Sequence, residues 1–316
     1  MRHETSGLGL LRRWSHRVQL APVMTEPQTL PPLPAIEPAQ TADVIIRFIR
    51  AQMEQTGFER IVVGLSGGVD SATVAFLCAR AVGPDNLLAV RMPFRTSSQT
   101  SETDALRVVT ALGCRTERVD ITPMVEPMLS LIAHPEQPAG GDVLNVRRGN
   151  VMARQRMIVI YDRSVAFDAL VAGTSNKTEA LLGYGTLFGD MAAAFAPIGD
   201  LYKTQLRGVA LHLGVPEEIL AKPPSADLWP GQTDEGELGR SYDVLDRTLF
   251  ALVDRRWSAD RCAAAGLDPD LVAWVARRVA QMEFKRQLPP VAKVSLRTPG
   301  IDHLYPRRRP GSRRGG

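Results

Sequence analysis

The sequence predicts an α/β protein with a doubly wound, mostly parallel sheet flanked by helices, and with a helical C-terminal part. Three observations support this fold class. Short apolar runs of strand length recur along the first part of the 316-residue chain. Segments whose apolar residues have helical spacing separate these runs. After the last run, helical patterns continue alone between loops rich in proline and glycine. Because parallel strands need a crossover connection, usually a helix, this alternation favours a parallel sheet.

The expected elements place two loops at one edge of this sheet. Strands are expected at residues 60–65, 86–91, 115–119 and 170–172. Helices are expected from Thr41, a candidate N-cap, then over 72–82, 103–112, 142–163 and 202–213, with further helices over 216–285. Ligands on such sheets bind outside the carboxyl ends of the strands. We therefore expect the chemistry at the loops after Leu65 and Ala172.

Two terminal segments differ in composition from the rest. Residues 1–40 hold six prolines between positions 22 and 38, and they are expected to form a disordered extension in which Met24 is an alternative start. Residues 296–316 are expected to form a disordered Arg-rich tail. Residues 301–316 carry five arginines and one acidic residue, which accounts for the whole formal net charge of +4. The rest is formally neutral, so no nucleic-acid binding is expected.

Two further classes are not expected from the sequence. No apolar run approaches the roughly 18–20 residues of a membrane helix, so no membrane association is expected. The three cysteines, Cys78, Cys114 and Cys262, form no CxxC pair, which argues against a disulfide framework or a zinc site. Together these features predict a cytoplasmic protein.

The loop after the first strand has the composition of an anion-binding site. Gly67 and Gly68 allow a tight turn and let backbone amides approach an anion closely. The helix that follows directs its partly positive end at the same place. Asp70 would repel a bare phosphate, so a Mg²⁺ is expected between them. A Walker A loop is excluded because its lysine is missing. The stretch expected to bind ATP is Gly64, Leu65, Ser66, Gly67, Gly68, Val69, Asp70 and Ser71.

This loop resembles that of the ATP pyrophosphatases of the adenine-nucleotide α-hydrolase-like superfamily, which split ATP between its α and β phosphates. Further strings make residues 41–295 similar to the NAD synthetase family; they lie at 149–157, 173–179, 183–190, 197–204 and 222–235. The resemblance implies an AMP-forming amide ligase. In that reaction ATP adenylates deamido-NAD with release of pyrophosphate, and ammonia then attacks the adenylate to give NAD.

The resemblance also implies roles for single residues. Asp70 and Glu179 would hold Mg²⁺, since both are hard oxygen ligands. Thr174, Lys203 and Ser225 would contact ATP, and Asp70 and Lys203 would be catalytic, with Lys203 as the point charge for the leaving pyrophosphate. The residues that would hold deamido-NAD are Arg154, Asn150, Asp190 and Lys285. Arg156, two positions after Arg154, equally suits a structural ion pair because it faces another direction.

Three positions depart from the family pattern. Leu187 stands where many ammonia-dependent members have a lysine, Ala194 where they have an aspartate, and Phe284 where they have a histidine. These positions normally touch the dinucleotide, so its binding is expected to differ locally. The stretch 183–191 also resembles the synthetase domain of glutamine-dependent members.

The nitrogen source is expected to be free ammonia. A glutaminase needs a nucleophilic cysteine in a domain of its own, and the forty residues before the first expected helix hold no cysteine. A separate glutaminase subunit remains an alternative supplier. The resemblance implies a homodimer. Two rival readings stay open: another ligase with the same loop, similar to GMP synthetase or a tRNA-thiolating enzyme, and a non-catalytic adenine-nucleotide binder.

Overall fold

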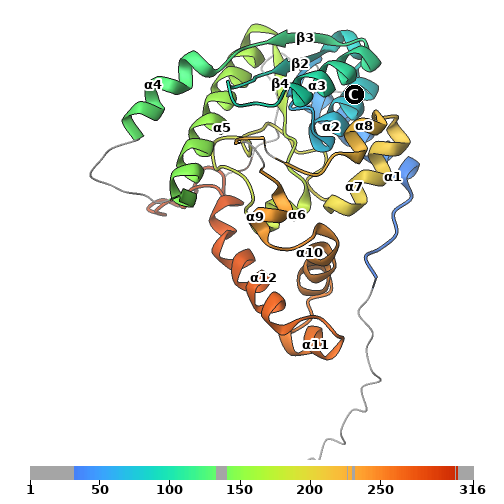
Figure 1. Cartoon of the computed structure of the whole chain (residues 1–316), viewed down its shortest axis with the longest axis vertical. Helices are drawn as coiled ribbons and strands as arrows, with labels where there is room; N and C mark the ends of the chain where they lie inside the picture. Colours follow the sequence, from blue (N-terminus) through green and yellow to red (C-terminus); the bar gives the residue numbers. More distant parts are fainter. Residues whose placement is uncertain (1–31, 133–140, 226, 230–231, 303, 305–316) are drawn as a thin grey trace, which may run out of the picture.

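The structure is a computed structural model that describes residues 32–132, 141–225, 227–229, 232–302 and 304 (Figure 1). Residues 1–31 and the five arginines after position 306 lie outside the described residues. Within them, no helix is long and apolar enough to cross a membrane.

Four parallel strands form the sheet, which confirms the predicted fold class. They are β1 (Arg60–Gly64), β2 (Leu87–Arg91), β3 (Arg115–Arg118) and β4 (Ala169–Ala172), in the order β3-β2-β1-β4. The chain moves outward from β1 to β3 and then returns to the other side of β1. The strand order therefore reverses between β1 and β4, which is where ligands bind in open α/β sheets.

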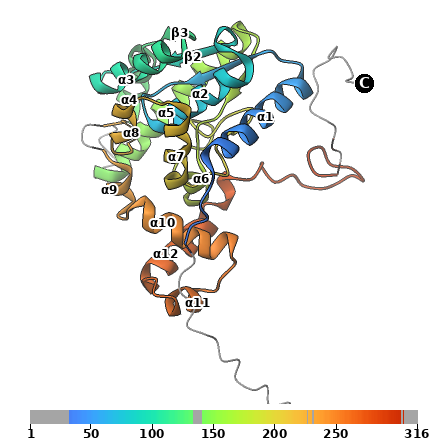
Figure 2. The same ribbon diagram turned by 90° about the vertical axis from the view of Figure 1, so that its right-hand side faces the viewer.

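Helices cover both faces of the sheet (Figures 1 and 2). One face carries α1 (Pro38–Thr56), α2 (Val69–Val82), α3 (Gln99–Leu112), α7 (Lys203–Leu213) and α8 (Glu217–Ala221). The other carries α4 (Thr122–Ile132) and α5 (Gly141–Ala166). Within β1, Ile61 and Val63 join the first apolar cluster and Val62 joins the second. All three are fully buried, as a strand covered on both faces requires.

The N-cap of the first helix lies four residues before the expected one. Glu37, not Thr41, is the N-cap of α1: its carboxylate accepts hydrogen bonds from the amides of Ala39 and Gln40. Pro38 occupies the first helical position, where its fixed φ suits a helix and its missing N–H costs nothing. The Thr41 hydroxyl instead donates back to the Glu37 carbonyl at 2.8 Å.

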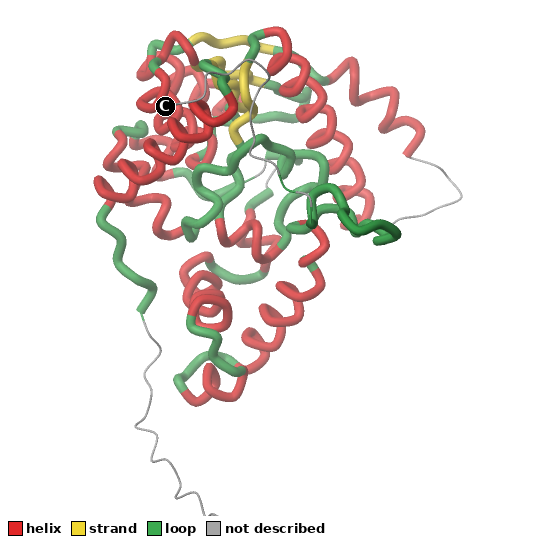
Figure 3. Tube along the Cα trace, turned by 180° about the vertical axis from the view of Figure 1, so that it is seen from behind, coloured by secondary structure: helices red, strands yellow, loops and turns green. Residues whose placement is uncertain are grey.

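The C-terminal part is helical, as expected, and packs below the carboxyl edge of the sheet (Figures 1 and 3). It consists of α6 (Lys177–Leu182), α9 (Asp234–Leu238), α10 (Tyr242–Leu249), a π-helical turn (Phe250–Asp254), α11 (Ala259–Ala264), α12 (Pro269–Gln281) and a short 3₁₀ turn at Glu283–Lys285. A further 3₁₀ turn, Pro84–Asn86, joins α2 to β2. Leu182, Leu245 and Leu249 form the centre of its own apolar core. Loops gather between this part and the sheet, and the site lies there.

Candidate active site

A cavity of about 1280 Å³ opens at the carboxyl ends of the strands. The loops after β1, β2 and β4 line it, together with one side of α5 and the segment 222–229. The two loops that the sequence placed far apart meet in it, because β1 and β4 are neighbours. Its volume exceeds the roughly 300–1,000 Å³ of a pocket for one small ligand, so two nucleotides can share it.

Hydrogen bonds between two serines and a close backbone approach at a glycine fix the shape of the loop after β1. The Ser71 hydroxyl accepts a hydrogen bond from the Ser66 amide at 3.2 Å and lies 3.1 Å from the Ser66 hydroxyl. Gly67 has a φ of +78°, and a Cβ built on it would lie 2.2 Å from the carbonyl oxygen of Ser101 in α3. The backbone of α3 therefore packs directly against the loop. Gly68 then caps α2, with Asp70 in the first turn of that helix.

A buried lysine joins the two carboxylates that were expected to hold metal. The Lys203 ammonium lies 2.5 Å from Asp70 Oδ2 and 3.0 Å from Glu179 Oε1, and its residue is only 4% exposed. Asn176 donates to the other Asp70 oxygen at 2.8 Å and forms a capping box with Glu179. The predicted residues Asp70, Glu179 and Lys203 thus form one cluster beside the phosphate loop.

Burial and charge act in opposite directions on this cluster. Burial raises the pKa of Glu179 to about 7, although Lys203 opposes the shift. Burial alone would lower the pKa of Lys203, but Asp70 and Glu179 outweigh it, and the pKa of the lysine is raised. The lysine therefore remains a cation in the cavity.

A fully buried carboxylate, which sequence reasoning missed, positions Lys203. Asp246 is fully buried and accepts hydrogen bonds from the Thr178 hydroxyl at 2.5 Å and from the Thr204 amide at 2.9 Å. The Lys203 amide in turn donates to the Thr178 hydroxyl at 3.0 Å. Asp246 thus ties α10 to α6 and to the start of α7. The sequence feature that could have identified Asp246 is its place on the apolar face of a helix, between Leu245 and Leu249.

Asp234 is another missed residue of the cavity wall. It is buried, and its two oxygens accept hydrogen bonds from the hydroxyls of Tyr184 at 3.1 Å and Tyr242 at 3.0 Å. Burial raises the pKa of Asp234, while Lys203 opposes the shift. Its charge adds to the acidic surroundings of the lysine.

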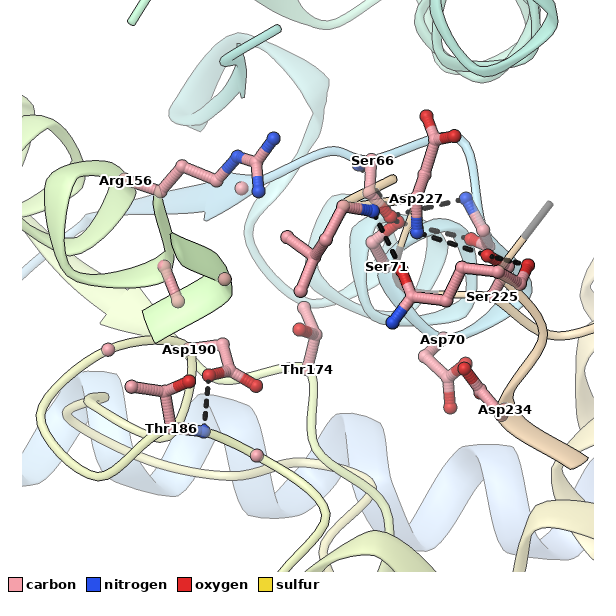
Figure 4. A pocket seen from close by; sticks show the side chains of 18 of the residues that line it. Ser66, Asp70, Ser71, Arg156, Thr174, Thr186, Asp190, Ser225, Asp227 and Asp234 are labelled. Carbon is pink, nitrogen blue, oxygen red and sulfur yellow. Dashed lines mark hydrogen bonds between the residues drawn. The ribbon is translucent and has the colours of Figure 1, made fainter. Parts of the chain in front are cut away.

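The remaining predicted ATP contacts also line the cavity (Figure 4). Thr174 follows β4. Ser225 donates to the carbonyl of Gln232 at 2.7 Å and accepts from the amide of Asp227 at 3.1 Å. The Asp227 carboxylate accepts from the Ser98 amide at 2.9 Å. The segment that carries Ser225 is therefore fastened to the N-cap of α3, on the side of the phosphate loop where Ser101 lies.

Three of the four residues expected to hold the dinucleotide come together. The Asp190 carboxylate accepts from the Thr186 amide at 2.7 Å, and the Thr186 hydroxyl donates to the side-chain oxygen of Asn150 at 2.7 Å. Lys285 donates to the carbonyls of Gly183 and Gly185 at 2.8 and 2.6 Å. Burial raises the pKa of Asp190 and lowers that of Lys285. All three line the cavity, and Figure 4 shows Asp190 on the other side of it from Ser225.

Arg154 and Arg156 of α5 lie differently from what their motif suggested. Arg154 is exposed, does not line the cavity, and donates to the carbonyl of Leu187 at 3.3 Å. Arg156 lines the cavity instead. Within the described part of the chain it forms no ion pair, and its Nε donates to the carbonyl of Met92 at 3.1 Å. The structural ion pair considered for Arg156 is therefore not observed.

The carboxylates of Asp70 and Glu179 suit a metal ion that binds as a complex with the phosphates of ATP. No group of three or more His, Cys, Asp or Glu side chains among the described residues forms a complete metal site. The two carboxylates nevertheless direct oxygens at one point, now held by the Lys203 ammonium. Mg²⁺ commonly takes one or two carboxylates and completes its shell with water and substrate phosphates. The donor set therefore fits Mg²⁺ bound together with ATP.

Comparison with known proteins gives consistent matches. The family model "NAD synthase" matches residues 41–289. The NH(3)-dependent NAD(+) synthetase of Chlorobium phaeobacteroides (strain BS1) is 49% identical over 269 residues, which is 85% of this chain and 94% of that protein. Among solved structures, the NH3-dependent NAD synthetase of Campylobacter jejuni has a TM-score of 0.67 and 32% identity, over 82% of this chain and 100% of that one. The NMN synthetase of Francisella tularensis has a TM-score of 0.68 and 29% identity, over 82% and 99%.

Proposed function

The chain belongs to the NAD synthase family, and on that premise we propose that it makes NAD, AMP and pyrophosphate from deamido-NAD, ATP and ammonia. One observation carries the proposal: the phosphate loop, the Asp70–Lys203–Glu179 cluster and the Asp190 cluster face a single cavity. An enzyme that joins ATP to a second nucleotide needs this arrangement.

The first step is adenylation. The nicotinate carboxylate of deamido-NAD attacks the α-phosphorus of ATP, and pyrophosphate leaves with the electron pair of the broken P–O bond. The amides of Gly67 and Gly68 and the hydroxyls of Ser66 and Ser71 hold the phosphates that leave. Lys203 moves from its carboxylates to the phosphates and neutralises their charge. Asp70 and Glu179 would hold Mg²⁺, which would supply further neutralisation of the phosphate oxygens.

The second step is amide formation. Ammonia attacks the activated carbonyl and loses a proton, and AMP leaves. The Asn150, Thr186 and Asp190 hydrogen bonds give the nicotinate end of the cavity a fixed shape. Alignment of the two reactants supplies much of the rate, because a bimolecular reaction becomes effectively unimolecular. Lys285 is held by two carbonyls at the same end, and it is placed to contact the dinucleotide.

A second candidate substrate is the mononucleotide analogue of deamido-NAD. It is favoured by the similarity to the Francisella tularensis NMN synthetase and by Leu187, which stands where a dinucleotide-contacting lysine is common in the family. A chain with fewer contacts to the distal nucleotide would discriminate less against the shorter substrate. The 49% identity to a protein named for NAD synthesis favours the dinucleotide.

The function is tested by pyrophosphate release from the purified full chain with ATP, Mg²⁺ and ammonium. We expect release with deamido-NAD, little with nicotinate mononucleotide, and none with XMP, because the cavity is built for a nicotinate end. Glutamine in place of ammonium is expected to give little product. Release with XMP but not with deamido-NAD would indicate a GMP synthetase-like ligase. ATP binding without release in any mixture would indicate a non-catalytic nucleotide binder.

An exposed apolar stripe on α5 supports a homodimer. Ile158, Tyr161 and Val165 are 55%, 38% and 83% exposed and follow one another at helical spacing. Arg154, one turn before Ile158, lies on the same stripe. Neighbouring α4 adds Met124 and Leu131 to the exposed apolar surface. Apolar patches of this kind mark interaction sites. Arg154 does not line the cavity of its own subunit. We propose that two copies pair through this face, so that Arg154 contacts the dinucleotide bound to the partner subunit.

A charge on this stripe is expected to break the dimer. We expect Ile158→Asp combined with Val165→Asp to give a monomer in light scattering after size-exclusion chromatography, with kcat/KM for deamido-NAD reduced about 100-fold because Arg154 loses its partner. Val44→Asp is the matched control, since Val44 is 62% exposed on α1, on the opposite side of the sheet. A wild-type protein that runs as a monomer, or a double variant that remains dimeric, would contradict this interface.

A further inference from the structure

Arg156 is a cation of the cavity wall that the reaction described so far does not use. It reaches from α5 into the cavity toward the phosphate loop (Figure 4). One of its five N–H groups donates to the carbonyl of Met92 at 3.1 Å. The four N–H groups on its two terminal nitrogens have no hydrogen-bond acceptor among the described residues. A guanidinium fixed through Nε therefore presents its fork to the cavity.

The surroundings of Arg156 make its positive charge unfavourable unless a ligand supplies an opposite charge. Burial lowers the pKa of Arg156, and the charges of Asp227 and Asp190 oppose that shift only in part. Neither carboxylate forms an ion pair with it. Arg156 is partly buried, so water stabilises its charge less than it would at the surface, and perturbed charges of this kind are frequent at functional sites. The site therefore favours an anion that lies against the guanidinium.

The position of Arg156 identifies that anion. Met92, which holds its Nε, follows β2, and the Met92 Cε lies 3.2 Å from a Cβ built on Gly64, where the phosphate loop begins. Asp190, at the nicotinate end, is close enough to act on its charge. Arg156 thus lies between the ATP end and the nicotinate end of one cavity. The group that must occupy this middle position is the α-phosphoryl group of ATP, which the carboxylate attacks.

We propose that Arg156 is a catalytic residue that binds the α-phosphoryl oxygens through its terminal nitrogens during adenylation. The inference rests on the proposed function. As the nicotinate carboxylate forms its bond to the α-phosphorus and the bond to the bridging oxygen of pyrophosphate breaks, negative charge gathers on the non-bridging oxygens. A planar fork matches two phosphoryl oxygens and remains protonated throughout. It also offsets the repulsion between the approaching carboxylate and the phosphate.

The test is ATP–pyrophosphate exchange by the full chain with deamido-NAD and Mg²⁺ but without ammonia, which reports adenylation alone. We expect Arg156→Met to lower the exchange rate about 100- to 1000-fold, the loss typical of one transition-state donor, with KM for ATP and deamido-NAD changed less than about 3-fold. Arg156→Lys should recover about 10-fold of this loss, and added guanidine should partly restore Arg156→Met. A purely structural arginine would show no such recovery.

Arg163→Met is the matched control. Arg163 lies two turns later on the same face of α5, does not line the cavity, and forms an ion pair with Glu117 of β3 at 2.7 Å. It should lower the melting temperature and keep exchange within about 2-fold, whereas Arg156→Met should keep the wild-type melting temperature.

Three results would overturn the role of Arg156. They are unchanged exchange in Arg156→Met, a loss confined to KM for deamido-NAD, and an exchange defect in Arg156→Lys that follows a drop in melting temperature. If Arg156→Met does not fold, the role of Arg156 is decided with Arg156→Lys, by whether the substitution changes kcat or KM. A wild-type chain without exchange would instead refute the proposed function itself.

Discussion

Lys203→Met is expected to abolish adenylation and to destabilise the ligand-free protein at the same time. The ammonium is buried between Asp70 and Glu179, so its removal leaves two carboxylates without a counter-ion. Breaking a buried pair in this way costs about 3–5 kcal/mol. The same ammonium is the charge that meets the leaving pyrophosphate, and its loss should lower the rate of pyrophosphate release by about 100- to 1000-fold.

Added Mg²⁺ distinguishes the two roles of Lys203. A divalent cation between Asp70 and Glu179 can replace the lost ammonium, so we expect Mg²⁺ to raise the unfolding free energy of Lys203→Met more than that of the wild type, by about 2.7 kcal/mol at a hundredfold excess over Kd. Pyrophosphate release should remain low, because the metal does not restore the lysine. Urea unfolding with and without Mg²⁺ measures this difference.

Lys177→Met is the control for Lys203→Met. Lys177 also joins two carboxylates, with its ammonium 2.8 Å from Asp254 and 3.0 Å from Asp200, but it does not line the cavity. We expect a smaller loss of stability and an activity within about 3-fold of the wild type. Equal activity losses in the two variants would show that Lys203 acts only through stability.

The fold was largely predictable because its signals are local. The strand at Arg60–Gly64 shows as three β-branched residues, 61–63, closed by Gly64, and its neighbours β2 and β4 show as short apolar runs. Helix α4 was missed, since Pro123 and Pro127 read as helix breakers while its buried side consists only of Val125 and Ile132. The N-cap was misplaced because a glutamate is not a common cap, although Glu37 reaches two amides here.

The site was predictable only where its residues are contiguous. The phosphate loop is one short string, so its position and its hydroxyls follow from the sequence. The role of Asp246 depends on contacts with Thr178 and Thr204, which reach it from other helices, and no short-range pattern shows them. Arg154 and Arg156 of α5 show the same limit. Their spacing indicates that they face different directions, but only the fold shows that Arg156 faces the cavity.

Gly67→Ala is the second change with a large expected effect, because two independent constraints meet at this glycine. Its φ of +78° is a conformation that costs an alanine about 1–2 kcal/mol. The added Cβ would also lie 2.2 Å from the carbonyl oxygen of Ser101, which is a backbone atom and cannot rotate away, so the loop must move away from α3. A misplacement of about 1 Å costs roughly 100-fold in rate in an aligned site. We therefore expect kcat/KM for ATP to fall at least about 100-fold, measured by pyrophosphate release.

Gly113→Ala separates the two constraints. Gly113 ends α3 with a φ of +64°, but nothing lies within 4 Å of a Cβ built on it. It should lose about 1–2 kcal/mol of unfolding free energy and retain its affinity for ATP, because only the backbone conformation is strained. Gly67→Ala should lose more stability than this control, as well as its ATP binding. Calorimetric titration compares ATP binding by the two variants. If Gly67→Ala bound ATP as tightly as Gly113→Ala, the contact between α3 and the loop would not shape the phosphate site. The amides of Gly68 and Val69 would then have to hold the phosphates without that contact.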